Sequence, residues 1–213
     1  MNQELRFIEC SSPSCSFRFP FDGDLDLVHY CPKCGSETRV NVYEIKKSQN
    51  PSPTFHNCYL QNKLVVILDN IRSVYNVGSI FRTADGFGIR KIYLCGITTT
   101  PINNRLHKTS LGSETIIDWE YQNNCINLCL SLINQGYSII SLENHPTALD
   151  IQDFLPALKN PKIALVVGNE KSGVDPEIIK MSHSVLSIPM AGFKESYNVA
   201  VAFGIVLYHL LSR

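Results

Sequence analysis

The sequence lacks a long apolar segment, and its beginning does not resemble a signal peptide. The most apolar run, VAVAFGIVLYHLL (199–211), is too short to span a membrane and is interrupted by Tyr208 and His209. We therefore expect a buried helix there. The first residues, MNQEL, have neither the basic start nor the apolar stretch of a secretory signal. These absences predict a cytoplasmic protein that does not associate with a membrane.

The chain also has no excess of charge, because 19 Lys and Arg residues balance 19 Asp and Glu residues. A net charge of zero argues against non-specific binding to nucleic acid. The distribution is uneven, however, since residues 51–110 hold seven basic and two acidic side chains. A local basic patch on a neutral protein suits a partner with a few phosphates, and a solvated surface explains it equally well.

Disulfides are not expected in a cytosolic protein, yet four of the eight cysteines fall within the first 34 residues. Cys10, Cys15, Cys31 and Cys34 form the pattern C-x4-C-x15-C-x2-C. Four thiolates are a tetrahedral ligand set that zinc prefers, and they leave no open position for a substrate. The pattern therefore predicts a structural Zn²⁺ site. Four unrelated thiols, or His29 in place of one cysteine, are the alternatives.

The second cysteine pair lies in CPKCG, where Pro32 and Gly35 favour a tight turn that directs both sulfurs toward one metal. A unit of fewer than about 50 residues rarely buries enough surface to fold alone, so a metal would also stabilise it. We predict a small β-rich, zinc-ribbon-like module over residues 1–45. The polar segment that follows contains two prolines and is predicted to be a linker over 46–59.

Residues 60–213 alternate strand-like and helix-like segments, with no internal repeat. Apolar strands without polar alternation indicate a parallel sheet that helices cover on both faces. Cys125 and Cys129 lie one helical turn apart and are predicted to be core thiols. The expected strands are 63–69, 91–96, 137–143, 162–168 and 184–189, and the expected helices are 77–87, about 122–135, 175–182 and 197–212.

The loops after three of these strands are rich in glycine, asparagine and small polar residues, at the edge where an open parallel sheet binds its ligand. The first is NIRSVYNVGSIFRTADGFG (70–88), whose apolar residues follow helical spacing: Val77, Ile80, Phe81, Ala84 and Phe87. Arg82 lies off that stripe beside small residues, which would let a ligand or another backbone approach closely. An ordinary surface ion pair between Arg82 and Asp85 is the alternative.

The second loop, VVGNEKSGVDPEII (166–179), contains two glycines that permit a tight turn, followed by an Asp-Pro pair that starts a helix. Glu170 lies inside that turn, and a plain loop carboxylate is the alternative. The third loop, SIPMAGFKESYNVAVAFGIVLYHL (187–210), has Ser196 and Asn198 where a helix begins. Capping explains one of these two residues, but it does not explain the Pro-Met-x-Gly loop before them.

Taken in this order, the three segments resemble motifs of the SpoU (TrmH-type) RNA ribose 2′-O-methyltransferases of the SPOUT superfamily. NVGSIFRT is similar to the first motif, VVGNEKSG to the second, and IPMAGFKESYNVAVA to the third. HKTSLGSE (107–114) is also similar to the loop between the first two motifs. The resemblance covers about residues 60–213, with Tyr197 where the family commonly has leucine. The four-cysteine module lies outside the common family core.

The resemblance implies an α/β fold that ends in a trefoil knot, with helices on both faces of a parallel sheet. It implies an enzyme that transfers a methyl group from S-adenosyl-L-methionine to a ribose 2′-hydroxyl of tRNA or rRNA, and a homodimer with its active site at the interface. The implied active-site residues are Arg82, which is central, Asn76, Glu170, Ser196 and Asn198. The implied cofactor-binding residues are Gly168, Asn169, Ile188, Met190 and Tyr197. Candidate RNA contacts are Arg72, Arg105, His107 and Lys108.

Two other functions compete with this interpretation. A non-catalytic RNA-binding protein would use the zinc module to bind RNA and would retain a vestigial knot. The presence of Asn76, Arg82, Glu170 and Asn198 argues against such decay. An oxidoreductase that binds a nucleotide on a Rossmann sheet is disfavoured, because no G-x-G-x-x-G follows the first strand.

Overall fold

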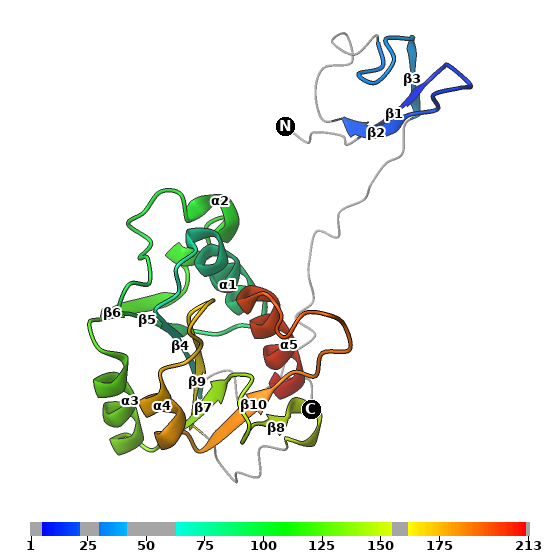
Figure 1. Cartoon of the computed structure of the whole chain (residues 1–213). Helices are drawn as coiled ribbons and strands as arrows, with labels where there is room; N and C mark the ends of the chain where they lie inside the picture. Colours follow the sequence, from blue (N-terminus) through cyan, green and yellow to red (C-terminus); the bar gives the residue numbers. More distant parts are fainter. Residues whose placement is uncertain (1–5, 22–29, 42–62, 155–161, 212–213) are drawn as a thin grey trace. The chain divides into compact units, whose positions relative to one another are not determined.

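The computed structural model describes residues 6–21, 30–41, 63–154 and 162–211. The chain divides into two compact units, residues 1–53 and 54–213, whose elements are labelled in Figure 1. The division falls inside the predicted linker, 46–59, which lies outside the described residues, as does His29. The domain limits 1–45 and 60–213 remain predictions.

The first unit contains a three-stranded antiparallel sheet. Strand β1 (Arg6–Cys10) lies between β2 (Arg18–Phe21) and β3 (Thr38–Asn41). Ile8 in the middle of β1 is fully buried, and it pairs with an aromatic residue on β2 and a β-branched residue on β3. The predicted β-rich unit is therefore confirmed.

Seven parallel strands form the sheet of the second unit, in the order β6-β5-β4-β9-β7-β10-β8. The strands are β4 (Leu64–Asp69), β5 (Lys91–Cys95), β6 (Asp118–Gln122), β7 (Tyr137–Leu142), β8 (Leu149–Asp150), β9 (Lys162–Val167) and β10 (Ser184–Ser187). All five expected strands are present, and their ends differ from the prediction by two residues at most. The predicted parallel sheet is confirmed.

Helices cover both faces of this sheet, as expected (Figure 1). The helices are α1 (Val74–Gly86), α2 (His107–Ser110), α3 (Cys125–Asn134), α4 (Pro176–Met181) and α5 (Val199–Leu211). Helices α1 and α5 pack on one face, and α3 and α4 pack on the other. Successive side chains of a strand point to opposite faces, so Val66 belongs to the first core and Ile67 to the second. Burial on both faces explains why the first five residues of β4, 64–68, are all apolar.

The buried helix expected at the C-terminal end of the chain is α5, where Phe203, Val206 and Leu207 are inaccessible to solvent. Cys125 and Cys129 are buried on α3, which confirms them as core thiols. Within the ranges that the structure describes, no helix has the length and apolar character needed to cross a membrane.

The sequence pattern did not reveal β6, β8 or α2. Strand β6 (DWEYQ) is an edge strand without a buried residue, so it carries no apolar run. Strand β8 has two residues and α2 has four, which is too short for either periodicity to develop. The trefoil knot that the resemblance implies stays a prediction.

Candidate active site and metal centre

The three loops predicted to carry the chemistry all lie at the carboxyl edge of the sheet, where β4, β9 and β10 end. Glu170, in the loop after β9, accepts hydrogen bonds at the amino end of α1. Its carboxylate receives the backbone N–H of Arg72 at 2.8 Å, the backbone N–H of Ser73 at 3.0 Å and the side-chain amide of Asn76 at 2.9 Å. Glu170 is therefore more than a solvated loop carboxylate, because it joins the second loop to the first.

Asn76 connects this carboxylate to the third loop. The side-chain amide of Asn198 donates to Asn76 Oδ1 at 3.1 Å, while Asn76 donates to Glu170. Asn198 also accepts the backbone N–H of Ala200 at 3.0 Å and so contributes to the start of α5. Three predicted site residues from distant segments thus form one hydrogen-bonded chain, Glu170–Asn76–Asn198.

The surroundings of Glu170 keep its carboxyl group ionised at neutral pH. Partial burial raises the pKa of this group, but the hydrogen bonds from Arg72, Asn76 and Ser73 outweigh that effect and lower the pKa below its ordinary value. A negative charge is therefore fixed at the amino end of α1, where the helix dipole also favours it.

A cavity of about 400 Å³ opens beside this chain, a volume typical of small-molecule sites. Four of the five residues predicted to contact the cofactor line it, namely Gly168, Asn169, Ile188 and Tyr197. Glu170, Ser196 and Asn198 line it as well. Met190, the fifth predicted contact, is not among the residues that line the cavity.

The turn after β9 needs glycine because two backbone segments meet there. A Cβ atom on Gly168 would lie 2.3 Å from the carbonyl carbon of Gly173. Asn169 fixes the turn, since its side chain donates to the carbonyl of Asn70 at 2.6 Å and accepts the N–H of Lys171 at 2.9 Å. The side chain of Asn169 is therefore engaged within the protein.

Arg82 stays outside the hydrogen-bonded chain and does not line the cavity. It is exposed on α1, six residues and thus about 9 Å along the helix from Asn76. Among the described residues it forms no ion pair, and the alternative pairing with Asp85 is not formed. Asp85 instead accepts a hydrogen bond from the Ser113 hydroxyl at 3.2 Å.

The small residues beside Arg82 were expected to let a ligand or another backbone approach closely, and this expectation is only partly right for Gly78. A Cβ atom on Gly78 would lie 2.1 Å from Thr109 Oγ1 and 2.7 Å from the carbonyl oxygen of Leu106. The close neighbour of Gly78 is therefore the segment that forms α2 in the same chain. Gly78 does not by itself indicate a ligand or a second subunit.

The four candidate RNA contacts, Arg72, Arg105, His107 and Lys108, are all exposed. Helix α2 holds the last two close to α1, because the hydroxyl of Thr109 donates to the carbonyl of Tyr75 at 3.2 Å. His107 is fixed by Glu114, whose carboxylate lies 2.8 Å from His107 Nδ1. His107 and Lys108 therefore belong to a helix that packs against α1, and RNA binding by the four residues stays a prediction.

The sequence reasoning missed Glu143 and Asn144, which also line the cavity. Both follow β7, which ends at the same edge of the sheet as β9 and β10. A strand order that placed β7 beside β9 would have indicated them, but the sequence pattern does not give strand order.

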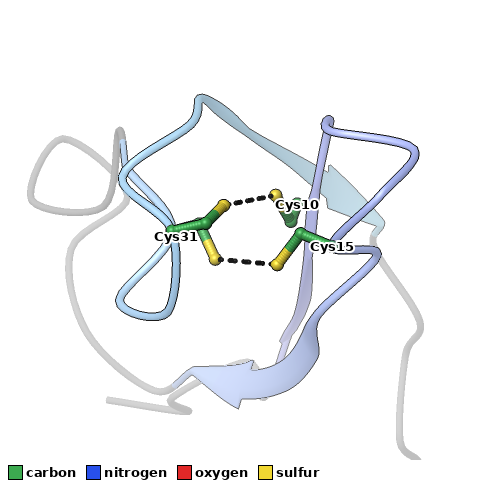
Figure 2. Close-up of side chains that lie close together, drawn as sticks. Cys10, Cys15 and Cys31 are labelled. Atoms are coloured by element: carbon green, nitrogen blue, oxygen red, sulfur yellow. Dashed lines mark hydrogen bonds between the residues drawn. The ribbon is translucent and has the colours of Figure 1, made fainter.

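The four N-terminal cysteines form a separate cluster in the first unit. Their sulfur atoms all lie within 4.8 Å of one another, and Figure 2 shows the sulfurs of Cys10, Cys15 and Cys31 turned toward a common centre. The distance is 3.5 Å between the sulfurs of Cys10 and Cys34, and 3.9 Å between those of Cys15 and Cys31. A tetrahedral zinc ion with Zn–S bonds of about 2.3 Å requires sulfurs about 3.8 Å apart. The cluster therefore fits zinc.

Two tight turns present these cysteines. Gly35 has φ +73° and donates its N–H to the carbonyl of Cys31 at 2.8 Å, as the CPKCG sequence predicts. Ser16 has φ +45° and closes the other turn through its N–H to the carbonyl of Ser12 at 2.9 Å. The N–H of Lys33 points to the sulfur of Cys31 at 3.4 Å, a contact of the kind that supports a thiolate ligand.

Comparisons with known proteins find relatives of the second unit. The profile of the SpoU rRNA Methylase family matches residues 63–208. The chain belongs to the SpoU family. The matched residues exclude the cysteine module, as expected from the sequence motifs, and include all three motifs of the site.

Two curated relatives of this SpoU chain act on different RNAs. The tRNA (guanosine(18)-2′-O)-methyltransferase of Aquifex aeolicus is 31% identical over 150 residues, which are 70% of this chain and 68% of the relative. The 23S rRNA (guanosine(2553)-2′-O)-methyltransferase of Bacillus subtilis is 32% identical over 149 residues, which are 68% of this chain and 57% of the relative.

Two solved structures share the fold of the second unit. The TrmH/SpoU tRNA modifying enzyme of A. aeolicus matches with a TM-score of 0.63 and 30% identity, covering 70% of this chain and 74% of that one. An AdoMet-bound rRNA methyltransferase from Sinorhizobium meliloti matches with a TM-score of 0.64 and 27% identity, covering 83% of this chain and 64% of that one.

Proposed function

We propose that the chain transfers a methyl group from S-adenosyl-L-methionine to a ribose 2′-hydroxyl of tRNA or rRNA. The observation that carries this proposal is the Glu170–Asn76–Asn198 chain beside a cavity of about 400 Å³. The three loops that build this arrangement are the three that resemble the SpoU motifs. Relatives that act on tRNA and on 23S rRNA support both classes of RNA as candidate substrates.

The cavity suits the cofactor in its chemistry as well as in its size. It combines apolar walls such as Leu142, Val167 and Ile188 with the peptide groups of the turn at Gly168 and Asn169. Such a mixture accommodates an adenine ring and fixes its orientation. S-adenosylmethionine supplies, when bound, the electrophilic methyl group on its sulfonium.

The acceptor hydroxyl must lose its proton and approach the methyl group in line, so that the oxygen–carbon bond forms as the carbon–sulfur bond breaks and S-adenosylhomocysteine leaves. Asn198 and Ser196 lie on the cavity wall and would orient the hydroxyl and the phosphate. Asn76 would hold Asn198 in place, because Glu170 fixes the other end of the Asn76 side chain. These residues therefore define where the ribose is presented.

Arg82 would bind the RNA phosphate with its two-pronged guanidinium and stabilise the developing alkoxide. A guanidinium keeps its proton at neutral pH, since its intrinsic pKa is above about 12. Its exposed position away from the cavity supports a homodimer in which Arg82 of one subunit completes the site of the other. We place the protein in the cytoplasm, where it would meet its RNA, and Zn²⁺ in the cysteine module as a structural ion.

Replacing Arg82 by alanine tests these assignments together. Arg82→Ala is expected to abolish methyl transfer from labelled S-adenosylmethionine to RNA, and to leave cofactor binding measured by calorimetry nearly unchanged. Arg90→Ala is a matched control, because Arg90 is an exposed arginine of the same unit outside the motifs. Turnover by Arg82→Ala equal to that of the control would contradict the role of Arg82. A wild-type protein that binds RNA but no cofactor would favour the non-catalytic alternative.

A further inference from the structure

Glu143 lies directly after β7, on the wall of the cavity, and it connects two loops. Its Oε2 accepts the backbone N–H of Val174 at 2.8 Å, and its Oε1 accepts the backbone N–H of Asn144 at 3.0 Å. Val174 belongs to the loop between β9 and α4, so one carboxylate links that loop to the end of β7. Val174 is buried, so removal of the carboxylate would leave its N–H without an acceptor, whereas the exposed Asn144 N–H could turn to water.

Two glycines of the second loop allow the loop backbone to approach the Glu143 carboxylate closely. Gly173 has φ +71°, and a Cβ atom there would lie 2.2 Å from Glu143 Oε2. Gly173 in turn lies against Gly168, where a Cβ atom would come within 2.3 Å of the Gly173 carbonyl carbon. A continuous contact therefore runs from Glu143 to Gly168, one of the predicted cofactor contacts.

Asn144, the residue after Glu143, forms a hydrogen bond to the third loop. The side-chain amide of Asn144 donates to the carbonyl of Glu195 at 3.3 Å, immediately before Ser196 and Tyr197. The pair 143–144 thus touches both loops that carry the predicted cofactor-binding residues. We propose that Glu143 is a positioning residue that holds these loops in the shape that binds S-adenosylmethionine. The inference rests on the function proposed above and adds a residue that none of its motifs contains.

A second carboxylate on the cavity wall, Glu195, makes it possible to distinguish the effect of losing a loop contact from the effect of losing a negative charge. Glu195 also lines the cavity, but its side chain is exposed and, among the described residues, forms no hydrogen bond or ion pair. Glu143→Gln and Glu195→Gln each remove one negative charge from the cavity. Only Glu143→Gln also turns a side-chain NH₂ group toward a backbone N–H and loses one of the two loop contacts.

The test measures the affinity of the full chain for S-adenosylmethionine by calorimetry. We expect Glu143→Gln to raise Kd about tenfold, because the single carbonyl oxygen of glutamine cannot accept from both Val174 and Asn144, and its NH₂ group repels the N–H that it then faces. Glu195→Gln is expected to change Kd less than about threefold, as an exposed charge does. In turnover assays, Glu143→Gln should raise KM for the cofactor while kcat at saturation stays near that of the wild type. Equal changes in the two variants, or a fall in kcat alone, would contradict a positioning role.

Gly173→Ala disturbs the contact between Glu143 and the second loop by changing the loop instead of the carboxylate. It is therefore an independent variant. It should also raise Kd for S-adenosylmethionine, because the new methyl group displaces the Glu143 carboxylate. An unchanged affinity in Gly173→Ala would overturn the proposal even where Glu143→Gln fails to fold. A wild-type chain that does not bind the cofactor would instead contradict the proposed function itself, and the role of Glu143 with it.

Discussion

Asn76 shows how a residue with no charge becomes central to the site. Its amide donates to Glu170 and accepts from Asn198, so one side chain orders two loops that are separated from it by 94 and 122 residues. The motifs predicted that all three residues belong to the site. They did not predict the hydrogen-bonding partner of each, because which loop tip touches which depends on strand order.

The ionisation of Glu170 makes the free energy of unfolding depend on pH. Its hydrogen bonds lower the pKa of the folded state below the unfolded value of about 4.3, so its contribution is fully present above that pH. The contribution is lost as the pH falls through the folded pKa. We predict that Glu170→Gln unfolds at lower denaturant concentration than the wild type at pH 7, and that the difference shrinks below about pH 4. Denaturant titrations across this range check the prediction, and a difference that grows on acidification would contradict it.

At the scale of single elements, the sequence was most informative where an element is long and buried. The five apolar strands and the four longer helices follow from hydrophobic pattern, and Asp175 and Pro176 start α4 as N-cap and first residue, as predicted. Helix α2 shows the limit of such patterns. It has four residues, and its position is set by packing against Gly78 rather than by its own periodicity.

The contact between α1 and α2 predicts opposite effects for two glycines of α1. Gly78→Ala should destabilise the fold by about 1–3 kcal/mol, because the methyl group collides with Leu106 and Thr109. Gly86→Ala should change stability by no more than about 1 kcal/mol, in the stabilising direction, because nothing lies within 4 Å of the added atom. Denaturant unfolding of both variants checks this pair. Equal stability of the two would show that α2 does not pack as described.

At the scale of the whole molecule, the chain combines two units with separate sources of stability. The second unit has a core on both faces of a seven-stranded sheet, whereas the first relies on three short strands and four cysteines. The spacing of the cysteines is sufficient to predict their cluster, because ligand number and spacing are local properties of a sequence. The order of the seven parallel strands depends on contacts between distant segments, so no local pattern predicts it.

Metal removal should therefore affect the two units differently. We predict one equivalent of zinc per chain with the thiols reduced, and loss of order in the first unit alone when a chelator removes it. Cys34→Ser should lower the zinc content, whereas Cys129→Ala, in the core of the second unit, should retain it. Metal analysis together with thermal unfolding checks both statements. Less than half an equivalent of zinc in the reduced wild type would refute the site.

The proposed reaction leaves a methyl group on a ribose 2′-oxygen of the RNA, and mass spectrometry of the product RNA detects it. Purified wild-type protein is incubated with S-adenosylmethionine and with tRNA or rRNA from cells that lack the gene, and the RNA is digested to nucleosides for mass spectrometry. The proposed function, which the tRNA and 23S rRNA 2′-O-methyltransferase relatives support, predicts a nucleoside methylated on its ribose 2′-oxygen. Methylation on a base, or no methylated nucleoside from either class of RNA, would contradict the proposed function.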